Sequence, residues 1–331
     1  MVSRFLLLAL PAALACGKDA AHPPVATGSA AVGGSAPGAG TAVAGSAPGA
    51  GTAAGPAPGA CQPLPFAATT PVPEASAAAW ITHGGVPALL VISDSGNRGA
   101  YGIVDPTSGD TLEVGQLPLG EAGQDIEGLA SRGDLVHGVS SSGWIRVWRR
   151  APGDAGFELA VAAYPLGPVD LPDARPREDR PPAGTGMVCG AKVTNCGRNY
   201  EGLCLVDRAH ARGPCVGFVA AKADGHLYCV EERDGALVAT YDHRIAIGRP
   251  GTLADCAFGD DGTLWAGANL FDASSVYRVD GWDTPATATV TRLASLGVGF
   301  PEVLAVRGDV FYRMSDTGGG PSLMAAFRCA R

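Results

Sequence analysis

The sequence predicts an all-β protein: a β-propeller domain, five-bladed by our count, that follows a disordered N-terminal tether. Residues 125–134 align without gaps with residues 300–309, and Glu, Leu, Ala, Arg, Gly and Asp recur at the same places. Two looser copies begin at Asn199 and Leu253. Each copy consists of short β-rich runs separated by Gly/Asp turns. Such a unit cannot bury both sheet faces alone, so the copies are expected to stack side by side in a ring.

The N-terminus has the pattern of a signal peptide. Arg4 precedes the apolar run 5–14, and residues 13–16 read Ala-Leu-Ala-Cys, which resembles a bacterial lipobox. The resemblance implies that residues 1–15 are removed and that Cys16 is lipidated. The alternative is ordinary secretion with cleavage after Ala15. Gly17 follows the cysteine in place of the aspartate that retains lipoproteins at the inner membrane, which favours a lipid anchor in the outer membrane, facing the periplasm or the cell surface.

Residues 16–60 are expected to form the tether. They contain few charges and few large apolar side chains, and residues 34–42 recur as residues 45–53. Such a segment buries too little apolar surface to offset the entropy of ordering it. We therefore expect a disordered linker that holds the domain away from the membrane.

Residues 61–331 are predicted to be the propeller, with units that begin near residues 78, 125, 200, 254 and 302. The second unit is the clearest, with strands expected at about 125–131, 135–141, 144–150 and 157–163. The last unit lacks room for a fourth strand, so residues 61–72 are expected to supply it. Six blades remain an alternative if residues 168–198 contain another unit.

The cysteines predict disulfides. Apart from Cys16 there are eight, an even number in a chain with an export signal. We expect Cys61–Cys329 to clasp the two ends of the domain, adding on the order of 4 kcal/mol, and Cys189–Cys196 to close a loop in the 168–198 insertion. The alternative is that some of these cysteines are free buried thiols.

The repeated phrases resemble those of two known families. Asp-x-Glu-Gly-Leu at 125–129, Asn-Tyr-Glu-Gly-Leu at 199–203 and the run 91–97 resemble the SdiA-regulated and the esterase-like phytase propeller families. The resemblance implies a propeller over most of residues 78–318. It implies no single activity, because propellers host many unrelated functions. The insertion at 168–198 departs from both families.

Acidic residues recur at one position of the repeat. Glu127, Glu201 and Glu302 share this position, Asp255 falls at or next to it, and the first unit is expected to have Trp80 or a neighbour there. The first strand of each blade lines the channel, so a ring of carboxylates is expected to face the axis. Carboxylate oxygens suit Ca²⁺ or Mg²⁺, which predicts a channel cation site built from these four acids, with Asn199 nearby. The alternative is structural, with each acid accepting backbone N–H bonds from the adjacent blade.

A second polar set is expected near the same face. It follows the second strand of each unit and consists of Asp94, Ser141, Lys222, Asn269 and Asp316. We expect Asp94, Asn199, Lys222 and Asp316 to bind a ligand, with Lys222 meeting an anionic group or pairing with a Glu. The alternative is a solvated turn.

The net charge and the absence of two catalytic motifs limit the functions that the sequence predicts. The formal net charge of −8 argues against nucleic acid as a partner. The sequence shows no nucleophile elbow and no P-loop. The sequence therefore predicts a cell-envelope lipoprotein that binds a small ligand or an envelope protein, with Ca²⁺ as the candidate cofactor. Whether it is also an enzyme is left open, and the alternative is a metal-dependent hydrolase of phosphoesters or lactones.

Overall fold

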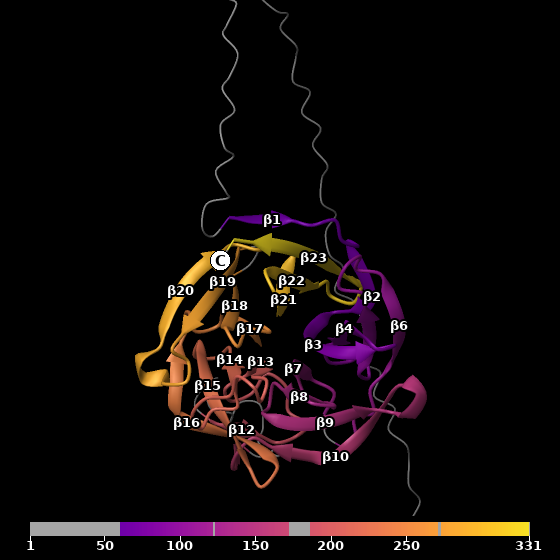
Figure 1. The fold of residues 1–331 in the computed structure, drawn as a ribbon. Coiled ribbons are helices and arrows are strands. Elements are labelled where there is room, and N and C mark those ends of the chain that lie inside the picture. Colours follow the sequence, from indigo (N-terminus) through magenta and orange to yellow (C-terminus); the bar gives the residue numbers. More distant parts are fainter. Residues whose placement is uncertain (1–59, 122, 172–185, 271–272, 331) are drawn as a thin grey trace, which may run out of the picture. The chain divides into compact units, whose positions relative to one another are not determined.

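The computed structural model describes residues 60–121, 123–171, 186–270 and 273–330, and this part of the chain is a five-bladed β-propeller (Figure 1). Apart from two short 3-10 turns, its regular elements are strands. No helix in these residues is long and apolar enough to cross a membrane. The predicted signal peptide, Cys16 and most of the tether lie outside the described residues.

Each blade is an antiparallel sheet whose first strand lies innermost. Blade 1 comprises β3 (Ala75–His83), β4 (Val86–Ser93), β5 (Ala100–Val104) and β6 (Thr111–Gln116). Blade 2 comprises β7 (Ile126–Arg132), β8 (Leu135–Ser140), β9 (Trp144–Arg150) and β10 (Phe157–Pro165). Blade 3 comprises β13 (Tyr200–Leu205), β14 (Gly217–Ala221), β15 (His226–Arg233) and β16 (Ala236–Ala246). Blade 4 comprises β17 (Leu253–Phe258), β18 (Leu264–Leu270), β19 (Ala273–Asp280) and β20 (Thr289–Ala294). Blade 5 contains β21 (Phe300–Arg307), β22 (Val310–Asp316) and β23 (Pro321–Cys329).

Tight turns connect the strands, as the Gly/Asp pattern predicts. The β3–β4 turn is Gly84-Gly85 and the β15–β16 turn is Asp234-Gly235, and all four residues have positive φ. Two consecutive residues with positive φ form the turn that matches the right-handed twist of a hairpin. Glycine adopts this conformation without the steric cost of a Cβ.

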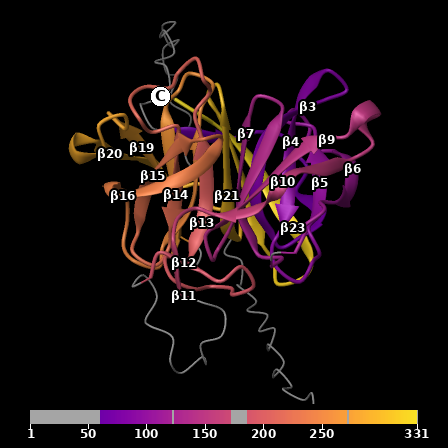
Figure 2. The ribbon, with the colours of Figure 1, turned by 90° about the horizontal axis from the view of Figure 1, so that it is seen from below.

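The last blade closes as predicted, with strands from both ends of the domain. The segments β1 (Cys61–Pro63) and β2 (Thr69–Pro73) both pair with β23. Cys61 lies opposite Cys329 in the β1–β23 register, and the two form a disulfide. The innermost strands contact one another in the cyclic order β3, β7, β13, β17, β21 and back to β3, and Figure 2 shows β7 and β13 side by side.

The core is divided among the blade interfaces. One apolar cluster fills each of the five interfaces between neighbouring sheets. Between blades 1 and 2, for example, Leu90 and Ile103 pack with Leu129 and Trp148. Each blade therefore buries both of its faces only because it has two neighbours.

The remaining disulfides lie in and beside blade 3. Cys189–Cys196 closes the loop in the insertion, Cys204–Cys256 joins β13 to β17, and Cys215–Cys229 links the segment before β14 to β15. The insertion adds a short parallel pair, β11 (Val169–Leu171) with β12 (Val188–Cys189), and no sixth blade among its described residues. Both pairings proposed from the sequence are present.

Candidate functional site: the acidic mouth of the channel

A β-bulge recurs near the start of every innermost strand and fixes which residues are equivalent. The register shifts fall at Ser76, Glu127, Glu201, Ala254 and Glu302. Three of the five bulges therefore carry a glutamate. Ser76, and not Trp80 or a direct neighbour of Trp80, occupies this position in blade 1, because the first strand begins earlier than the repeat indicated.

The glycine that follows the glutamate is required by close packing between innermost strands. A Cβ on Gly128 would lie 2.3 Å from the backbone nitrogen of Leu203, and a Cβ on Gly202 would lie 2.5 Å from a carboxylate oxygen of Asp255. Neither distance is sterically possible. The Glu-Gly-Leu phrase therefore combines an acid at the bulge with direct backbone contact to the next blade.

The second strands place their polar residues at the same end of the channel. In each blade, the innermost-strand residue just before the bulge pairs with a residue of the second strand. The next residue along the second strand is the polar one: Asp94, Ser141, Lys222, Asn269 or Asp316. This equivalence groups the predicted ligand-binding residues Asp94, Lys222 and Asp316 with the bulge glutamates. We call this end, defined by Asp94, Asp125, Glu127, Glu201 and Glu302, the acidic mouth.

Three carboxylates of the acidic mouth meet closely. Asp94, Asp125 and Glu127 each offer an oxygen within 4.8 Å of the others. Asp125 and Glu127 are buried, Asp94 is half-buried, and the hydroxyl of Ser141 donates a hydrogen bond to Asp125. Asp125 was not among the expected site residues. It lies just before the strand and two residues from Glu127, a spacing that places both side chains on the same side of an extended chain.

Two other glutamates share Lys222. Its ammonium lies 2.9 Å from an oxygen of Glu201 and 3.7 Å from an oxygen of Glu302. The amide of Asn199 donates to the second oxygen of Glu201 over 2.7 Å. The expected Lys222–Glu pairing is therefore present, and Asn199 contacts a glutamate.

Burial and mutual repulsion raise the pKa values of the triad. The pKa of Glu127 is well above its usual value, first because the side chain is fully buried and then because Glu201, Asp94 and Asp125 lie close. The pKa of Asp125 is also raised, mainly by burial, although the hydrogen bond from Ser141 opposes the shift. A carboxylate in this position is stabilised either by holding a proton or by a neighbouring cation.

The pKa values of the two glutamates beside Lys222 are also raised, but less strongly. Burial followed by repulsion from Glu201 raises the pKa of Glu302 to about 7. Burial also raises the pKa of Glu201, against the opposing attraction of Lys222. Burial alone would lower the pKa of Lys222, but its attraction to Glu201 reverses the sign and the pKa is raised. One lysine thus faces an excess of negative charge.

Asp255, which the sequence grouped with the ring, occupies the position after the bulge. Its carboxylate accepts the backbone N–H of Leu304 over 2.8 Å and of Cys256 over 2.7 Å. Leu304 belongs to the neighbouring blade. Asp255 therefore has the structural role that the sequence analysis gave as the alternative for the ring acids, which is to accept a backbone N–H from the adjacent blade. Asn269 has a similar role, because its amide donates to the carbonyl of Pro301 over 2.8 Å.

The chain was also compared with known proteins. No described protein family matches this chain, and no curated protein is similar to it in sequence. Among solved structures, the PQQ-bound aldose sugar dehydrogenase from Streptomyces coelicolor is 16% identical with a TM-score of 0.44, and the match covers 81% of this chain and 98% of that one. Glutaminyl cyclase from Myxococcus xanthus is 14% identical with a TM-score of 0.46, over 82% of this chain and 97% of that one. Similarities at this level carry no argument about activity.

Proposed function

We propose that this protein is a lipid-anchored envelope protein whose propeller holds a divalent cation at the acidic mouth and binds its ligand there. One observation carries the proposal: Asp94, Asp125 and Glu127 bring carboxylate oxygens within 4.8 Å of one another around a fully buried glutamate. In the described residues, the ion pairs of Lys222 run to Glu201 and Glu302 and not to this triad. A divalent cation would relieve the repulsion.

Calcium fits the chemistry of the three side chains. Ca²⁺ takes oxygen ligands, tolerates irregular geometry and accepts water in the remaining positions. Such an ion would keep Glu127 ionised and would leave coordination positions open toward the channel for a ligand with oxygen donors. Asp94, from the second strand, and Asp125 and Glu127, from the innermost strand, would hold it. Asp255 is assigned no part, because both of its oxygens already accept backbone hydrogen bonds.

Calorimetric titration of the purified full chain with Ca²⁺ and with Mg²⁺ tests the site. We expect wild-type protein to bind one ion per chain, and Glu127→Gln and Asp94→Asn to weaken binding roughly tenfold or more, because each removes a charged ligand. Asp234→Asn is the matched control, since Asp234 lies in the exposed β15–β16 turn. Absence of binding, or equal binding by all three variants, would contradict the cation site.

The lipid anchor is tested separately. Cells that express the full chain are labelled with a radioactive fatty acid, and the protein is recovered from outer-membrane and inner-membrane fractions. Wild-type protein should carry the label in the outer membrane, and Cys16→Ser should carry none. An unlabelled wild-type protein released to the soluble fraction would favour ordinary secretion instead.

A second candidate function is metal-dependent hydrolysis, and Glu302 favours it. Its pKa of about 7 gives the carboxylate the base strength that water activation needs at neutral pH. A cation bound by Asp94 and Glu127 would polarise a phosphoester or lactone at the same mouth. Hydrolysis assays with p-nitrophenyl phosphate and an acyl-homoserine lactone, with and without Ca²⁺, test this function. Turnover that rises with an apparent pKa near 7 and disappears in Glu302→Gln would support it, and calcium binding without turnover would exclude it for these substrates.

A further inference from the structure

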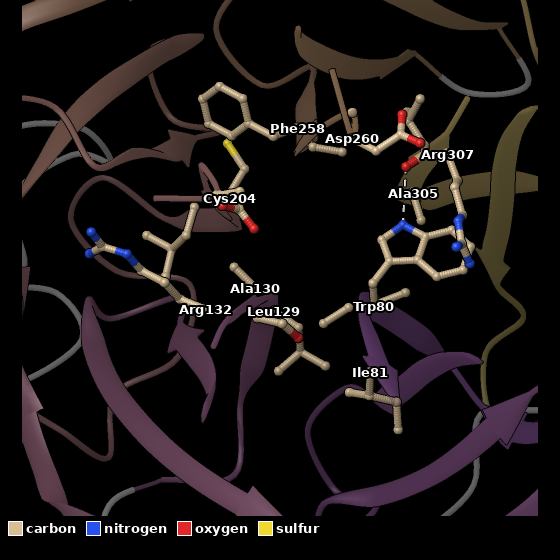
Figure 3. A pocket seen from close by; sticks show the side chains of 18 of the residues that line it. Trp80, Ile81, Leu129, Ala130, Arg132, Cys204, Phe258, Asp260, Ala305 and Arg307 are labelled. Atoms are coloured by element: carbon tan, nitrogen blue, oxygen red, sulfur yellow. Dashed lines mark hydrogen bonds between the residues drawn. The ribbon is translucent and has the colours of Figure 1, made fainter. Parts of the chain in front are cut away.

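The opposite end of the channel contains a cavity that the acidic mouth does not use. Its volume is about 560 Å³, and it lies where the innermost strands end (Figure 3). This volume falls within the usual range for small-molecule pockets. Glu127 and Arg132 are at opposite ends of β7, roughly 16 Å apart along an extended strand. The cavity and the carboxylates therefore belong to different mouths of one channel.

The cavity is open because the strands place small side chains on its wall. The position three residues after the bulge is occupied, blade by blade, by Ala79, Ala130, Cys204, Ala257 and Ala305, and all five line the cavity. Cys204 is held in place by its disulfide to Cys256. Larger apolar residues at these places would fill the channel. The sequence thus maintains a hollow with an apolar wall.

Two aromatic side chains face this hollow from opposite walls. Figure 3 shows Trp80 and Phe258 on either side of the opening. The indole N–H of Trp80 donates to the carbonyl of Val306 over 3.0 Å, and Tyr312 packs edge-on against the ring at 5.5 Å. Phe258 is held edge-on by Trp282 at 5.0 Å. Both rings are fixed before any ligand arrives, which favours an aromatic ligand that packs against the two opposite walls.

The rim of the cavity carries charges of both signs, and two of its arginines have no acidic partner among the described residues. Three arginines, Arg132, Arg208 and Arg307, line it against Asp207 and Asp260. Arg132 is ion-paired with Glu232, and Asp260 accepts the backbone N–H of Gly308 over 3.1 Å. Within the described part of the chain, neither Arg208 nor Arg307 forms an ion pair, and both side chains are exposed. The guanidinium of Arg307 lies over the Trp80 ring at 5.2 Å.

We propose that this arginine mouth, defined by Arg132, Arg208 and Arg307, binds a planar aromatic anion such as an aryl carboxylate. The rings of Trp80 and Phe258 would hold the aromatic part over the alanine wall. Arg208 and Arg307 would meet the carboxylate, and Arg307 has the planar fork that pairs with it through two parallel hydrogen bonds. The site is independent of the cation site and of any activity at the acidic mouth.

Binding of 2-naphthoate to the purified full chain, followed by calorimetry and by tryptophan emission, tests this site. We expect saturable binding that is roughly tenfold weaker for Arg208→Ala and for Arg307→Ala, because each loses a charged hydrogen bond. The matched control is Arg328→Ala on the outer strand β23, which should bind like wild type. Ala305→Leu should weaken binding by filling the cavity. Circular dichroism and melting establish that each variant is folded.

Two related probes separate the aromatic from the anionic requirement. Naphthalene-2-methanol has the same ring without the charge and should bind more weakly than 2-naphthoate, with equal affinity for wild type and both arginine variants. Cyclohexane carboxylate has the charge without the aromatic ring and should also bind more weakly. Equal binding of the acid and the alcohol, equal binding by wild type and Arg307→Ala, or no binding of 2-naphthoate would each overturn the proposal.

Discussion

At the scale of single residues, Gly128 shows why a propeller constrains its innermost strands so tightly. A side chain there has no room to move, because the atoms it would meet are the backbone of β13 and not a flexible side chain. The steric requirement comes from contact between blades, and φ at this position is not in the left-handed region. A glycine in the middle of a strand is otherwise unfavourable, and here the packing outweighs that cost.

Gly128→Ala should lower the free energy of unfolding by roughly 2–4 kcal/mol, because the added methyl group forces two blades apart. Chemical denaturation followed by tryptophan emission measures the change. Gly320→Ala is the control, since a Cβ there would meet an ordinary contact at 3.8 Å and the backbone conformation is unstrained. Equal stability of the two variants would mean that the ring accommodates the methyl group without moving apart.

Glu127 should destabilise the metal-free protein above neutral pH. Its pKa is raised in the folded state, so ionisation costs more there than in the unfolded chain. Glu127→Gln should therefore have a higher melting temperature than wild type at about pH 8 without metal, and the difference should vanish near pH 4, where the carboxyl group is protonated in both states. Addition of Ca²⁺ should reverse the order at pH 8. A variant that melts lower than wild type in all of these conditions would show that the carboxylate is structural.

At the scale of elements, blade 5 differs from the other blades because its strands do not all follow one another in the sequence. Two segments from the start of the domain complete a sheet whose other strands come from its end. Both segments of this closure are short, three residues in β1 and five in β2. The Cys61–Cys329 disulfide therefore has a large share in holding the ring closed.

Cys61→Ala with Cys329→Ala should lower the free energy of unfolding by about 5 kcal/mol, because the disulfide restrains a longer loop of the unfolded chain than the other three disulfides do. Cys215→Ala with Cys229→Ala is the matched comparison. Its loop spans 14 residues against 268, so the expected loss is smaller, about 3 kcal/mol. Denaturation under non-reducing conditions compares the two. A larger loss from the short loop would argue that local packing in blade 3 outweighs loop entropy.

The repeat made most of this architecture predictable from sequence. Equivalent phrases predicted the strands of blade 2 to within a few residues, and the lack of room for a fourth strand in the last unit predicted closure by residues 61–72. The cation triad was only partly predictable. Glu127 and Asp94 follow from the repeat. Asp125 does not recur, because the equivalent places two residues before the bulge in blades 3 and 5 hold Asn199 and Phe300, so the repeat could not single it out.

At the scale of the whole molecule, the metal-free protein should lose stability as pH rises. The carboxyl groups of Glu127, Glu201 and Glu302 have raised pKa values, so the stability they confer is present below about pH 4.5 and is lost as pH rises through about 7, the pKa of Glu302. Glu302 alone accounts for roughly 3 kcal/mol over this window. Glu113 and Glu231, whose pKa values are lowered, act in the opposite direction at acidic pH, and His137, whose pKa burial lowers to about 4, does so up to about pH 6.5.

Melting temperatures measured in a chelator from about pH 6.5 to pH 8 should therefore fall steadily, and millimolar Ca²⁺ should flatten the curve. Glu302→Gln should flatten it in part without metal. A metal-free curve that rises over this range would contradict the raised pKa values at the acidic mouth.

The Cys61–Cys329 bond also determines how the domain would respond to mechanical force. Tension applied to the chain before Cys61 passes directly through a covalent link into the outer strand of blade 5. Neither β2 nor β3 can be peeled away from that end, because the load bypasses them. A domain fixed to a surface by its leading end would thus be pulled as a closed ring, and could not be unwound one blade at a time.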